Sequence, residues 1–190
     1  IELAIGIMDD GAIMGAPLTA VTKHCKKYVL VVQGNEKTSD VAKKIQKIIG
    51  DMKKALESQI DGVAIAAPQI GKNLRIFVMS KRVFKLLDKN SEPNKIYKDQ
   101  VFINPKITKT SREKEESEEG CLSVRYLYGK VMRAKKATVE AFDENDKKFI
   151  SGGSGLIAQI FQHECDHLDG VLFTDKSKNL QEILPQKSKS

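Results

Sequence analysis

The sequence QHECDHL, from Gln162 to Leu168, contains the pattern HExxH. On a helix, His163 and His167 are one turn apart on the same face, so both imidazoles can reach one metal ion. Glu164 lies beside them, where it can accept a proton from water at such a site. The stretch therefore predicts a helix that carries two metal ligands and a general base. The competing interpretation is a pair of core histidines beside a solvated glutamate.

The residues before this pattern extend the predicted helix. Leu156 and Ile160 lie on the same stripe as the two histidines, so the histidines continue a buried face. The run SGGS at residues 151–154 is predicted to be a turn. Its last residue, Ser154, can cap a helix over residues 155–168.

The helices and strands predicted in the rest of the chain are typical of an α+β domain. An amphipathic helix is predicted over residues 41–56, where apolar residues recur at helical spacing between lysines. The acidic run 112–119 is predicted to be a solvated loop, and residues 81–100 a polar surface excursion. Strands are predicted before Pro68 and over 74–79, 101–107, 137–142 and 147–150. We expect short antiparallel or mixed strands packed around the central HExxH helix.

Length and composition limit the organisation of the chain. Its 190 residues are 41% hydrophobic, enough for one core. We expect a single catalytic domain over residues 1–175 and a short polar, basic tail over 176–190. No apolar run approaches the ~18 residues of a membrane span, and no secretory signal is expected. Three scattered cysteines favour a reducing compartment over a disulfide scaffold.

The charge balance is basic. Lys and Arg number 32 against 25 Asp and Glu, a net charge of +7. This charge is compatible with attraction to the ribosome, but it mostly indicates general solubility. Aromatic residues make up only 6%, which disfavours a base-stacking binder of single strands. We expect no specific nucleic-acid site.

The two histidines need a third ligand, since catalytic sites usually have three protein ligands and one open position. Cys165 lies two residues after His163 and points to another side of the helix, so we expect it to pack in the core. The His-Cys pair at residues 24–25 lies in a poorly patterned region. The best candidate is Cys121, because Gly120 before it allows close backbone approach. From the residue alone, a buried structural cysteine remains a competing interpretation.

Three segments resemble one known family. They are GVAIAAPQ at 62–69, EGCLS at 119–123 and QHECDH at 162–167. Together and in this order they resemble peptide deformylase, which has a GxGxAAPQ-type loop, an EGCLS strand and a QHExDH helix. The resemblance covers about residues 41–175. It implies a metal-dependent amide hydrolase that removes the formyl group from N-formylmethionine at the start of new polypeptides.

The resemblance implies a set of site residues. It makes Cys121, His163 and His167 the metal ligands, Glu164 the general acid/base, and the Gln69 amide and the Leu122 backbone N–H the donors to the developing oxyanion. Candidates for an apolar slot that holds the methionine side chain flank the motifs, although each can also be ordinary core. They are Val63, Ala64, Leu156 and Ile160.

The resemblance also implies cofactor and partners. We expect one divalent metal ion per chain, natively Fe²⁺, with Zn²⁺, Ni²⁺ or Co²⁺ as substitutes. The expected partners are N-formylmethionyl peptides, with proximity to the ribosome and no membrane. The expected location is the bacterial cytoplasm, or a mitochondrion or plastid in a eukaryote. The sequence gives no oligomeric state.

Three residues depart from the family pattern. Ala64 stands where the family usually has a second glycine, Arg125 where proline is common, and Tyr128 in a stretch where many members have an arginine. These changes bear on efficiency and on substrate preference. A catalytically weak relative, or one with another substrate, is therefore an alternative.

Two other classes of protein are also considered. An HExxH peptidase usually takes its third ligand downstream, but no histidine follows His167 and only Glu182 is considered as a candidate. A non-catalytic module would bind the ribosome or RNA through its basic surface and use the metal structurally, and it would be expected to have a fourth protein ligand.

Overall fold

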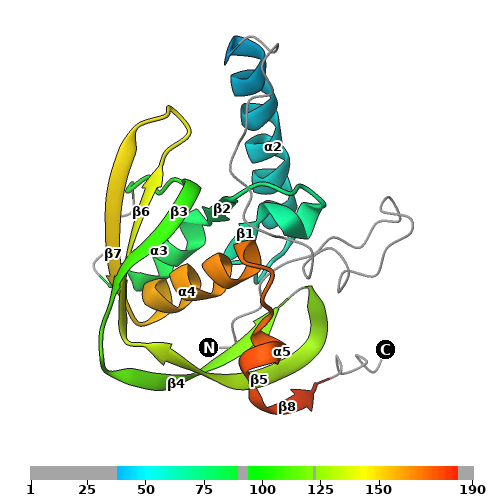
Figure 1. Ribbon diagram of the computed structural model, residues 1–190, viewed down its shortest axis with the longest axis vertical. Coiled ribbons are helices and arrows are strands. Elements are labelled where there is room, and N and C mark those ends of the chain that lie inside the picture. The colour runs from blue at the N-terminus through cyan, green and yellow to red at the C-terminus, as the bar shows by residue number, and fades with distance from the viewer. Residues whose placement is uncertain (1–37, 90–93, 122, 184–190) are drawn as a thin grey trace.

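Helix α2, Thr38–Ser58, is the amphipathic helix that the sequence predicts. The computed structural model describes residues 38–89, 94–121 and 123–183. Ile49, Met52 and Leu56 of α2 are buried and pack against the residues of the first two strands, whereas the N-terminal end of the helix rises above the sheets (Figure 1).

Two antiparallel sheets form the body of the fold. In the order in which they pair, the strands of the five-stranded sheet are β1 (Ala64–Ala66), β2 (Ile76–Met79), β3 (Gln100–Thr110), β6 (Lys136–Phe142) and β7 (Lys148–Ser154). Those of the three-stranded sheet are β4 (Lys114–Cys121), β5 (Val124–Ala134) and β8 (Lys178–Glu182). The remaining elements are the 3₁₀ helix η1 (Ala67–Ile70), α3 (Lys81–Leu87), α4 (Leu156–Leu168) and α5 (Phe173–Lys176). This architecture confirms the predicted α+β class.

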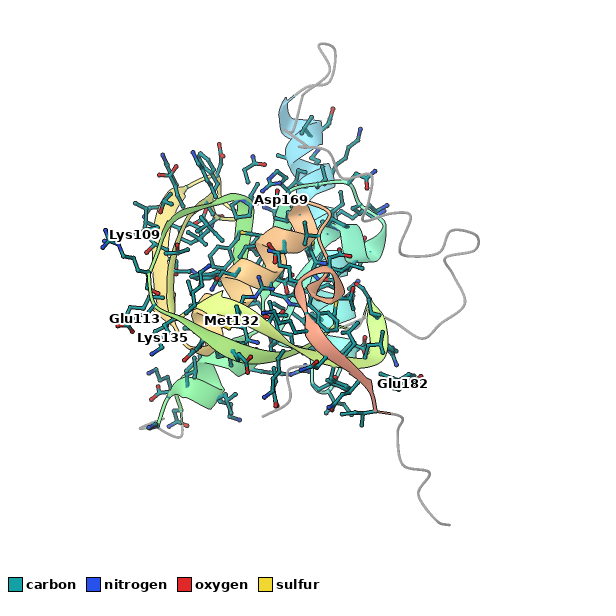
Figure 2. All side chains as sticks on the ribbon, turned by 60° about the horizontal axis from the view of Figure 1, so that its bottom comes forward. Lys109, Glu113, Met132, Lys135, Asp169 and Glu182 are labelled. Atoms are coloured by element: carbon teal, nitrogen blue, oxygen red, sulfur yellow. The ribbon has the colours of Figure 1, made fainter. Side chains whose placement is uncertain are left out.

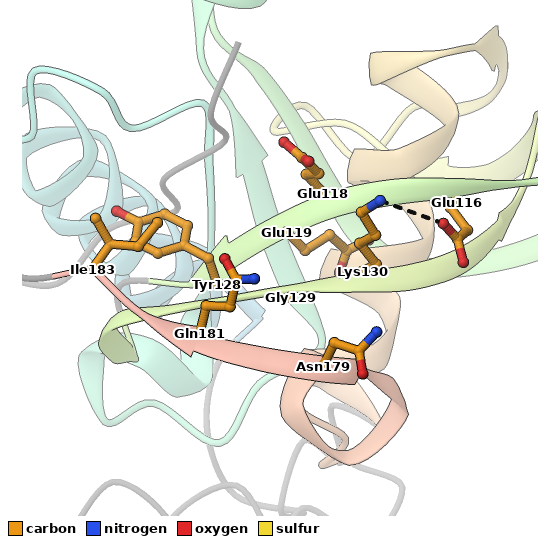
Figure 3. Close-up of a pocket in the computed structure, with 9 residues that line it drawn as sticks. All are labelled: Glu116, Glu118, Glu119, Tyr128, Gly129, Lys130, Asn179, Gln181 and Ile183. Carbon is orange, nitrogen blue, oxygen red and sulfur yellow. Dashed lines mark ion pairs between the residues drawn. The ribbon is translucent and has the colours of Figure 1, made fainter.

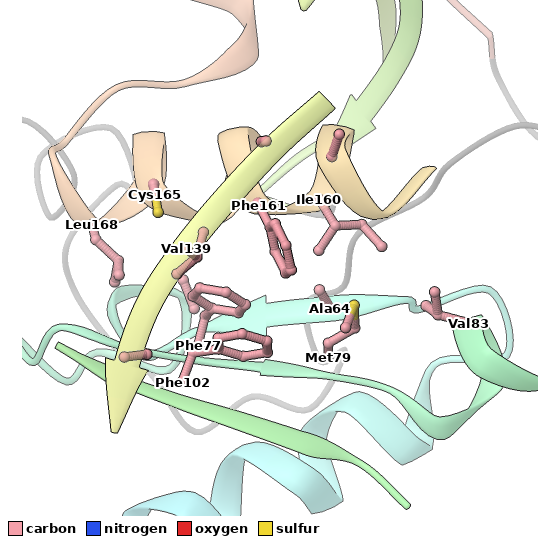
Figure 4. Close-up of a cluster of buried hydrophobic side chains, with 14 residues drawn as sticks. Ala64, Phe77, Met79, Val83, Phe102, Val139, Ile160, Phe161, Cys165 and Leu168 are labelled. Atoms are coloured by element: carbon pink, nitrogen blue, oxygen red, sulfur yellow. The ribbon is translucent and has the colours of Figure 1, made fainter. Parts of the chain in front are cut away.

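Helix α4, the predicted HExxH helix, lies in the middle of the fold and contacts both sheets (Figure 1). Its Phe161 meets Phe102 of β3 edge-on, with ring centroids 5.4 Å apart. Phe102 in turn stacks on Phe77 of β2 at 4.3 Å (Figure 4). Fully burying an aromatic side chain contributes about 1.5–3 kcal/mol. The Phe161 side of α4 therefore anchors the helix in the core, and the histidines lie on the opposite side of the helix, along the stripe that includes Ile160.

The start of α4 differs from the prediction. Residues 151–154 continue strand β7 instead of forming a turn. The residue before the helix is Gly155, with φ +54°, and no side-chain cap bond forms there, so Ser154 is not the cap. A Cβ at Gly153 would lie 2.2 Å from Cγ2 of Ile157, so only glycine lets β7 pass this close to the helix.

The acidic run 112–119 is not a loop, because most of it forms β4. The strand pairs antiparallel with β5 over its whole length. Glu116 and Glu118 are exposed, and Glu116 forms an ion pair with Lys130 of β5. Glu119 is fully buried. Cross-strand pairing and the burial of its last three residues therefore outweigh the low strand propensity of glutamate.

The segment after residue 80 also differs from the prediction, because it begins with helix α3 instead of an excursion. Ser80 caps this helix by accepting a hydrogen bond from the Arg82 backbone N–H at 3.2 Å, and Val83 is buried. At the other end of the chain, β8 lies beyond residue 175 and pairs with β5. The division into a domain and a tail stays a prediction.

The outside of the fold carries side chains of both charges. Figure 2 labels exposed lysines and acidic residues in different parts of the fold, among them Lys109, Glu113, Lys135 and Asp169. Lys135 and Glu113 form an ion pair at 3.5 Å. Among the described residues, no helix is long and apolar enough to cross a membrane.

Candidate metal centre

The two histidines of α4 meet a cysteine that lies 42 residues before the first of them in the sequence. Nε2 of His163 and Nε2 of His167 are 3.1 Å apart, and Sγ of Cys121 lies 3.2 Å from Nε2 of His167. All three residues are buried, and their ligand atoms lie within 4.8 Å of one another. Ligands of one zinc-type ion, each about 2.0–2.3 Å from it, have separations of this size.

Cys121 reaches this position at the end of β4. The register of β4 on β5 shifts between Gly120 and Cys121, so that Cys121 pairs with Val124 in a tight reversal of the chain. Although burial raises the pKa of the thiol, the imidazoles of His167 and His163 lower it well below its usual range. The sulfur is therefore a thiolate, the form that binds metal.

A carboxylate holds the first histidine from behind. Oε2 of Glu119 lies 2.9 Å from Nδ1 of His163, which leaves Nε2 facing the cysteine. Burial opposes a proton on His163, but Cys121 and Glu119 outweigh it and raise the pKa to about 10. Metal binding requires His163 to give up one proton. A carboxylate behind a metal-binding histidine fixes its tautomer and ring orientation.

Glu119 is itself held by an arginine of β5. The Arg133 guanidinium donates to both carboxylate oxygens of Glu119, at 2.7 and 2.9 Å, and to Asp166 of α4 at 2.6 Å. Lys176 of α5 then donates to both oxygens of Asp166. Burial would raise the pKa of Glu119, but the hydrogen bonds from Arg133 and His163 lower it to about 2. The network thus connects His163 to β4 and β5 of the three-stranded sheet and to α5.

Glu164 lies between the two histidines in the sequence of α4 and is buried with them. It is fully buried, and neither carboxylate oxygen has a hydrogen-bond partner among the described residues. Burial raises its pKa to about 7. A buried carboxyl with unpaired oxygens calls for a partner from outside the chain. A water beside a metal ion held by the Cys/His/His group meets that need, so the residues present fit a metal.

The two predicted oxyanion donors have different outcomes. Gln69, in η1, is 3% exposed, and its Nε2 lies 3.7 Å from Sγ of Cys121. The structure thus brings Gln69 to the candidate metal group. Leu122 lies outside the described residues.

The predicted substrate residues lie mostly in the hydrophobic core. Ala64 and Ile160 are fully buried members of the cluster around α4, and Val63 and Leu156 are partly buried against it. Their role in substrate binding stays a prediction. Cys165 belongs to the same cluster, and burial raises its pKa to about 12, as expected of a packing cysteine.

A hollow of about 130 Å³ opens beside the cysteine. Its lining includes the departures Arg125 and Tyr128, so two of the three unusual residues lie near the candidate centre. The full lining is Gln59, Asp61, Cys121, Arg125, Tyr126, Leu127 and Tyr128. A larger hollow of about 400 Å³ lies along β4, β5 and β8, lined by polar side chains such as Gln181 and by none of the three candidate ligands (Figure 3).

The residue considered for a downstream ligand lies elsewhere. Glu182 is exposed on β8 and does not belong to the Cys/His/His group. Within the described part of the chain, that group comprises three ligands, with no fourth.

Comparison with known proteins identifies the family. The family model of polypeptide deformylase matches residues 20–182. Peptide deformylase 2 of Clostridium acetobutylicum is 43% identical over 134 residues, which cover 70% of this chain and 78% of that relative. A solved peptide deformylase from Legionella pneumophila aligns with a TM-score of 0.65 and 35% identity, over 83% of this chain and 80% of that one. One from Synechococcus elongatus, in complex with actinonin, aligns with a TM-score of 0.60 and 32% identity, over 84% and 74%. The chain belongs to the polypeptide deformylase family.

Proposed function

We propose that Cys121, His163 and His167 hold one divalent metal ion, and that Glu164 is the general acid/base beside it. The protein is a metal-dependent hydrolase that removes the N-formyl group from newly made polypeptides, as its family membership establishes. The observation that carries the assignment is the meeting of the β4 sulfur with the two α4 imidazoles next to a buried carboxyl without partners.

The proposed ligand set suits the reaction. A formamide is a stable amide, so its hydrolysis at neutral pH requires an activated water. A divalent cation held by the three ligands would supply Lewis acidity, which lowers the pKa of water toward ~7 and polarises the formyl carbonyl. The Cys121 sulfur is already the thiolate that binds metal, and the carboxylate behind His163 fixes the orientation of the ring, whose extra proton leaves when the metal binds.

Glu164 is suited to proton transfer. Burial raises its pKa to about 7, close to the pH at which the group must both take up and release a proton. In the proposed reaction Glu164 accepts a proton from the attacking water and passes it to the leaving amine. Its burial excludes bulk water, which would otherwise compete for the same proton.

The negative charge on the formyl oxygen needs donors. We assign the Gln69 side-chain amide to this role, together with the Leu122 backbone N–H. Both are neutral, so neither has to be buried as a charge. Loss of one such donor typically costs ~10²–10³ in rate.

The proposed substrates are N-formylmethionyl peptides. The methionine side chain would take an apolar slot near Val63 and Leu156, which are the partly buried members of the predicted set. The peptide would then run past the hollow beside Cys121, where Arg125 and Tyr128 stand. Proximity to the ribosome and a bacterial cytoplasmic or organellar location stay predictions.

For the native metal we propose Fe²⁺, with Zn²⁺, Ni²⁺ or Co²⁺ as substitutes. Thiolate ligation makes an iron form sensitive to air, because oxygen can oxidise the metal or the sulfur. Iron-loaded protein should therefore lose activity in air and keep it under reductant, while the zinc form should not change. Equal air stability of the two forms would count against iron.

The ligand assignment is tested with a matched pair of cysteine variants. Cobalt-loaded wild type should show a thiolate-to-cobalt charge-transfer band in the near ultraviolet and release formate from a formyl-Met-Ala peptide. Cys121→Ser should lose both, whereas Cys165→Ser, which changes the packing cysteine, should keep both. A band that survives in Cys121→Ser would refute the ligand set. Internal cleavage of unformylated peptides by wild type would instead favour a peptidase.

A further inference from the structure

The Gln69 side-chain amide is held at both ends. Its Oε1 accepts a hydrogen bond from the Ala66 backbone N–H at 2.8 Å, and its Nε2 donates to Oγ of Ser123 at 3.0 Å. The side chain is only 3% exposed, so water has little access to take over either bond. The plane of the amide is therefore fixed between η1 and the chain after β4.

The amide nitrogen has two N–H groups that point in different directions. One is used by Ser123, and the other faces Sγ of Cys121 at 3.7 Å. This N–H···S contact is long, and thus weaker than the bond to the hydroxyl. It is the contact that Gln69 can exchange for a substrate oxygen beside the candidate ligands.

Ser123 is anchored to the same sulfur. Its backbone N–H donates to Sγ of Cys121 at 3.4 Å while its hydroxyl accepts from Gln69. The position of the hydroxyl relative to the metal group is therefore set by the turn between β4 and β5. A side chain without that hydroxyl would leave the amide held only at its oxygen, so rotation about its last torsion, which is a soft, broad one, would be less restrained.

We infer that Ser123 is a positioning residue for the reaction. Its hydroxyl orients the Gln69 amide so that one N–H points at the place where the formyl oxygen becomes negative. This rests on the proposed role of Gln69 as an oxyanion donor, and it adds a residue that acts only through Gln69.

The kinetic test uses formate release from a formyl-Met-Ala peptide. Ser123→Ala should lower kcat about tenfold, a part of the ~10²–10³ that a whole donor supplies, and change KM less than about threefold. Ser123→Thr keeps a hydroxyl and should recover most of kcat. Ser111→Ala, which removes a hydroxyl that bonds backbone in a distant turn, is the control and should leave kcat unchanged. Metal content should be equal in all four proteins.

The double variant separates positioning from a structural effect. In a Gln69→Ala background, Ser123→Ala should cause no further loss, because the group that it orients is gone. A further tenfold loss there would overturn the inference. If Gln69→Ala slows the reaction and Ser123→Ala does not, the inference fails and the role of Gln69 survives. If Gln69→Ala leaves kcat unchanged, both fail.

A readout without catalysis is available in the zinc-loaded protein. The two side-chain amide protons of Gln69, assigned in nitrogen-15 NMR spectra by their loss in Gln69→Met, should exchange slowly with solvent in wild type and at least about tenfold faster in Ser123→Ala. Fast exchange in wild type would contradict the inference, and this wild-type result does not depend on whether Ser123→Ala folds.

Discussion

The carboxylate of Glu119 and the guanidinium of Arg133 are joined by two hydrogen bonds of 2.7 and 2.9 Å in a place where neither side chain is more than 4% exposed. The pair links neighbouring strands, and its other contacts run to His163 on one side and Asp166 on the other. A buried charge pair of this kind is stable only when its polar atoms are satisfied. Here Glu119 meets this condition in part through its contact with His163, so the same pair also holds a candidate metal ligand in place.

Metal affinity should depend on Glu119. In Glu119→Gln the amide cannot match both the guanidinium and His163 as the carboxylate does, so the ring is held less well. We expect zinc affinity to fall about 10–100-fold, the usual effect of losing such a partner. Competition with a chelator of known affinity measures it. Glu118→Gln changes the exposed neighbour on the same strand and should leave affinity unchanged; equal losses in both variants would contradict the assignment.

Stability should depend on Arg133. Arg133→Met leaves the Glu119 charge buried without its main partner, which typically costs about 3–5 kcal/mol. Lys130→Met, on the same strand, removes an exposed ion pair with Glu116 at 3.7 Å and should cost less than about 1 kcal/mol. Urea denaturation of the metal-free proteins gives both free energies of unfolding. Similar values for the two variants would show that the buried network adds little.

The same network should make stability sensitive to acid. The pKa of Glu119 is about 2 in the folded protein against 4.5 for the free side chain. Its stabilising effect is therefore complete above pH 4.5 and is lost as the pH falls toward 2; the shift corresponds to about 3 kcal/mol. In urea denaturation of metal-free protein, the gap between wild type and Glu119→Gln should narrow by roughly 2 kcal/mol from pH 6 to pH 3. A gap that stays constant over this range would mean that Glu119 has an ordinary pKa.

Arg82 of α3 should stabilise the segment that leads into the first motif. Its guanidinium donates to four backbone carbonyls at and beyond the end of α2, those of Leu56, Glu57, Gln59 and Gly62. Arg82→Met leaves these acceptors without the cation, and we expect a loss of about 1–3 kcal/mol. Lys81→Met, which removes only an exposed ion pair with Glu57, is the control for thermal or urea unfolding. An equal effect of the two would argue against this cap.

Local patterns were sufficient for the helices that decide the fold. The spacing of His163 and His167 with Leu156 and Ile160 predicts α4, because one helix face is a property of a single segment. Strand β4 escaped prediction because its glutamates read as solvated, and its stability comes from pairing with β5, which is distant information. Helix α3 is only seven residues long, too short for a periodic signal.

For the site, too, local motifs were predictable and distant contacts were not. The motifs single out the three candidate ligands, and the structure brings them together, although their role remains a proposal. Arg133 could not be predicted, because an arginine in a strand reads as outward-facing and its partners lie 14 and 33 residues away. The sequence did contain one signal that a buried cation is needed, because its two partners, Glu119 and Asp166, are acidic residues inside the motifs. Nothing in the sequence indicated that Ser123 accepts a hydrogen bond from Gln69.

The central claim is that a metal held by Cys121, His163 and His167 works with Glu164 to remove the formyl group. The most direct test is formate release from a formyl-Met-Ala peptide by wild type and Glu164→Gln, each loaded with the same divalent metal. We predict one ion per chain in both proteins, release by wild type, and a rate at least ~10²-fold lower in the variant, as expected when a general acid/base is lost. Undiminished release by Glu164→Gln with its metal retained would contradict the account.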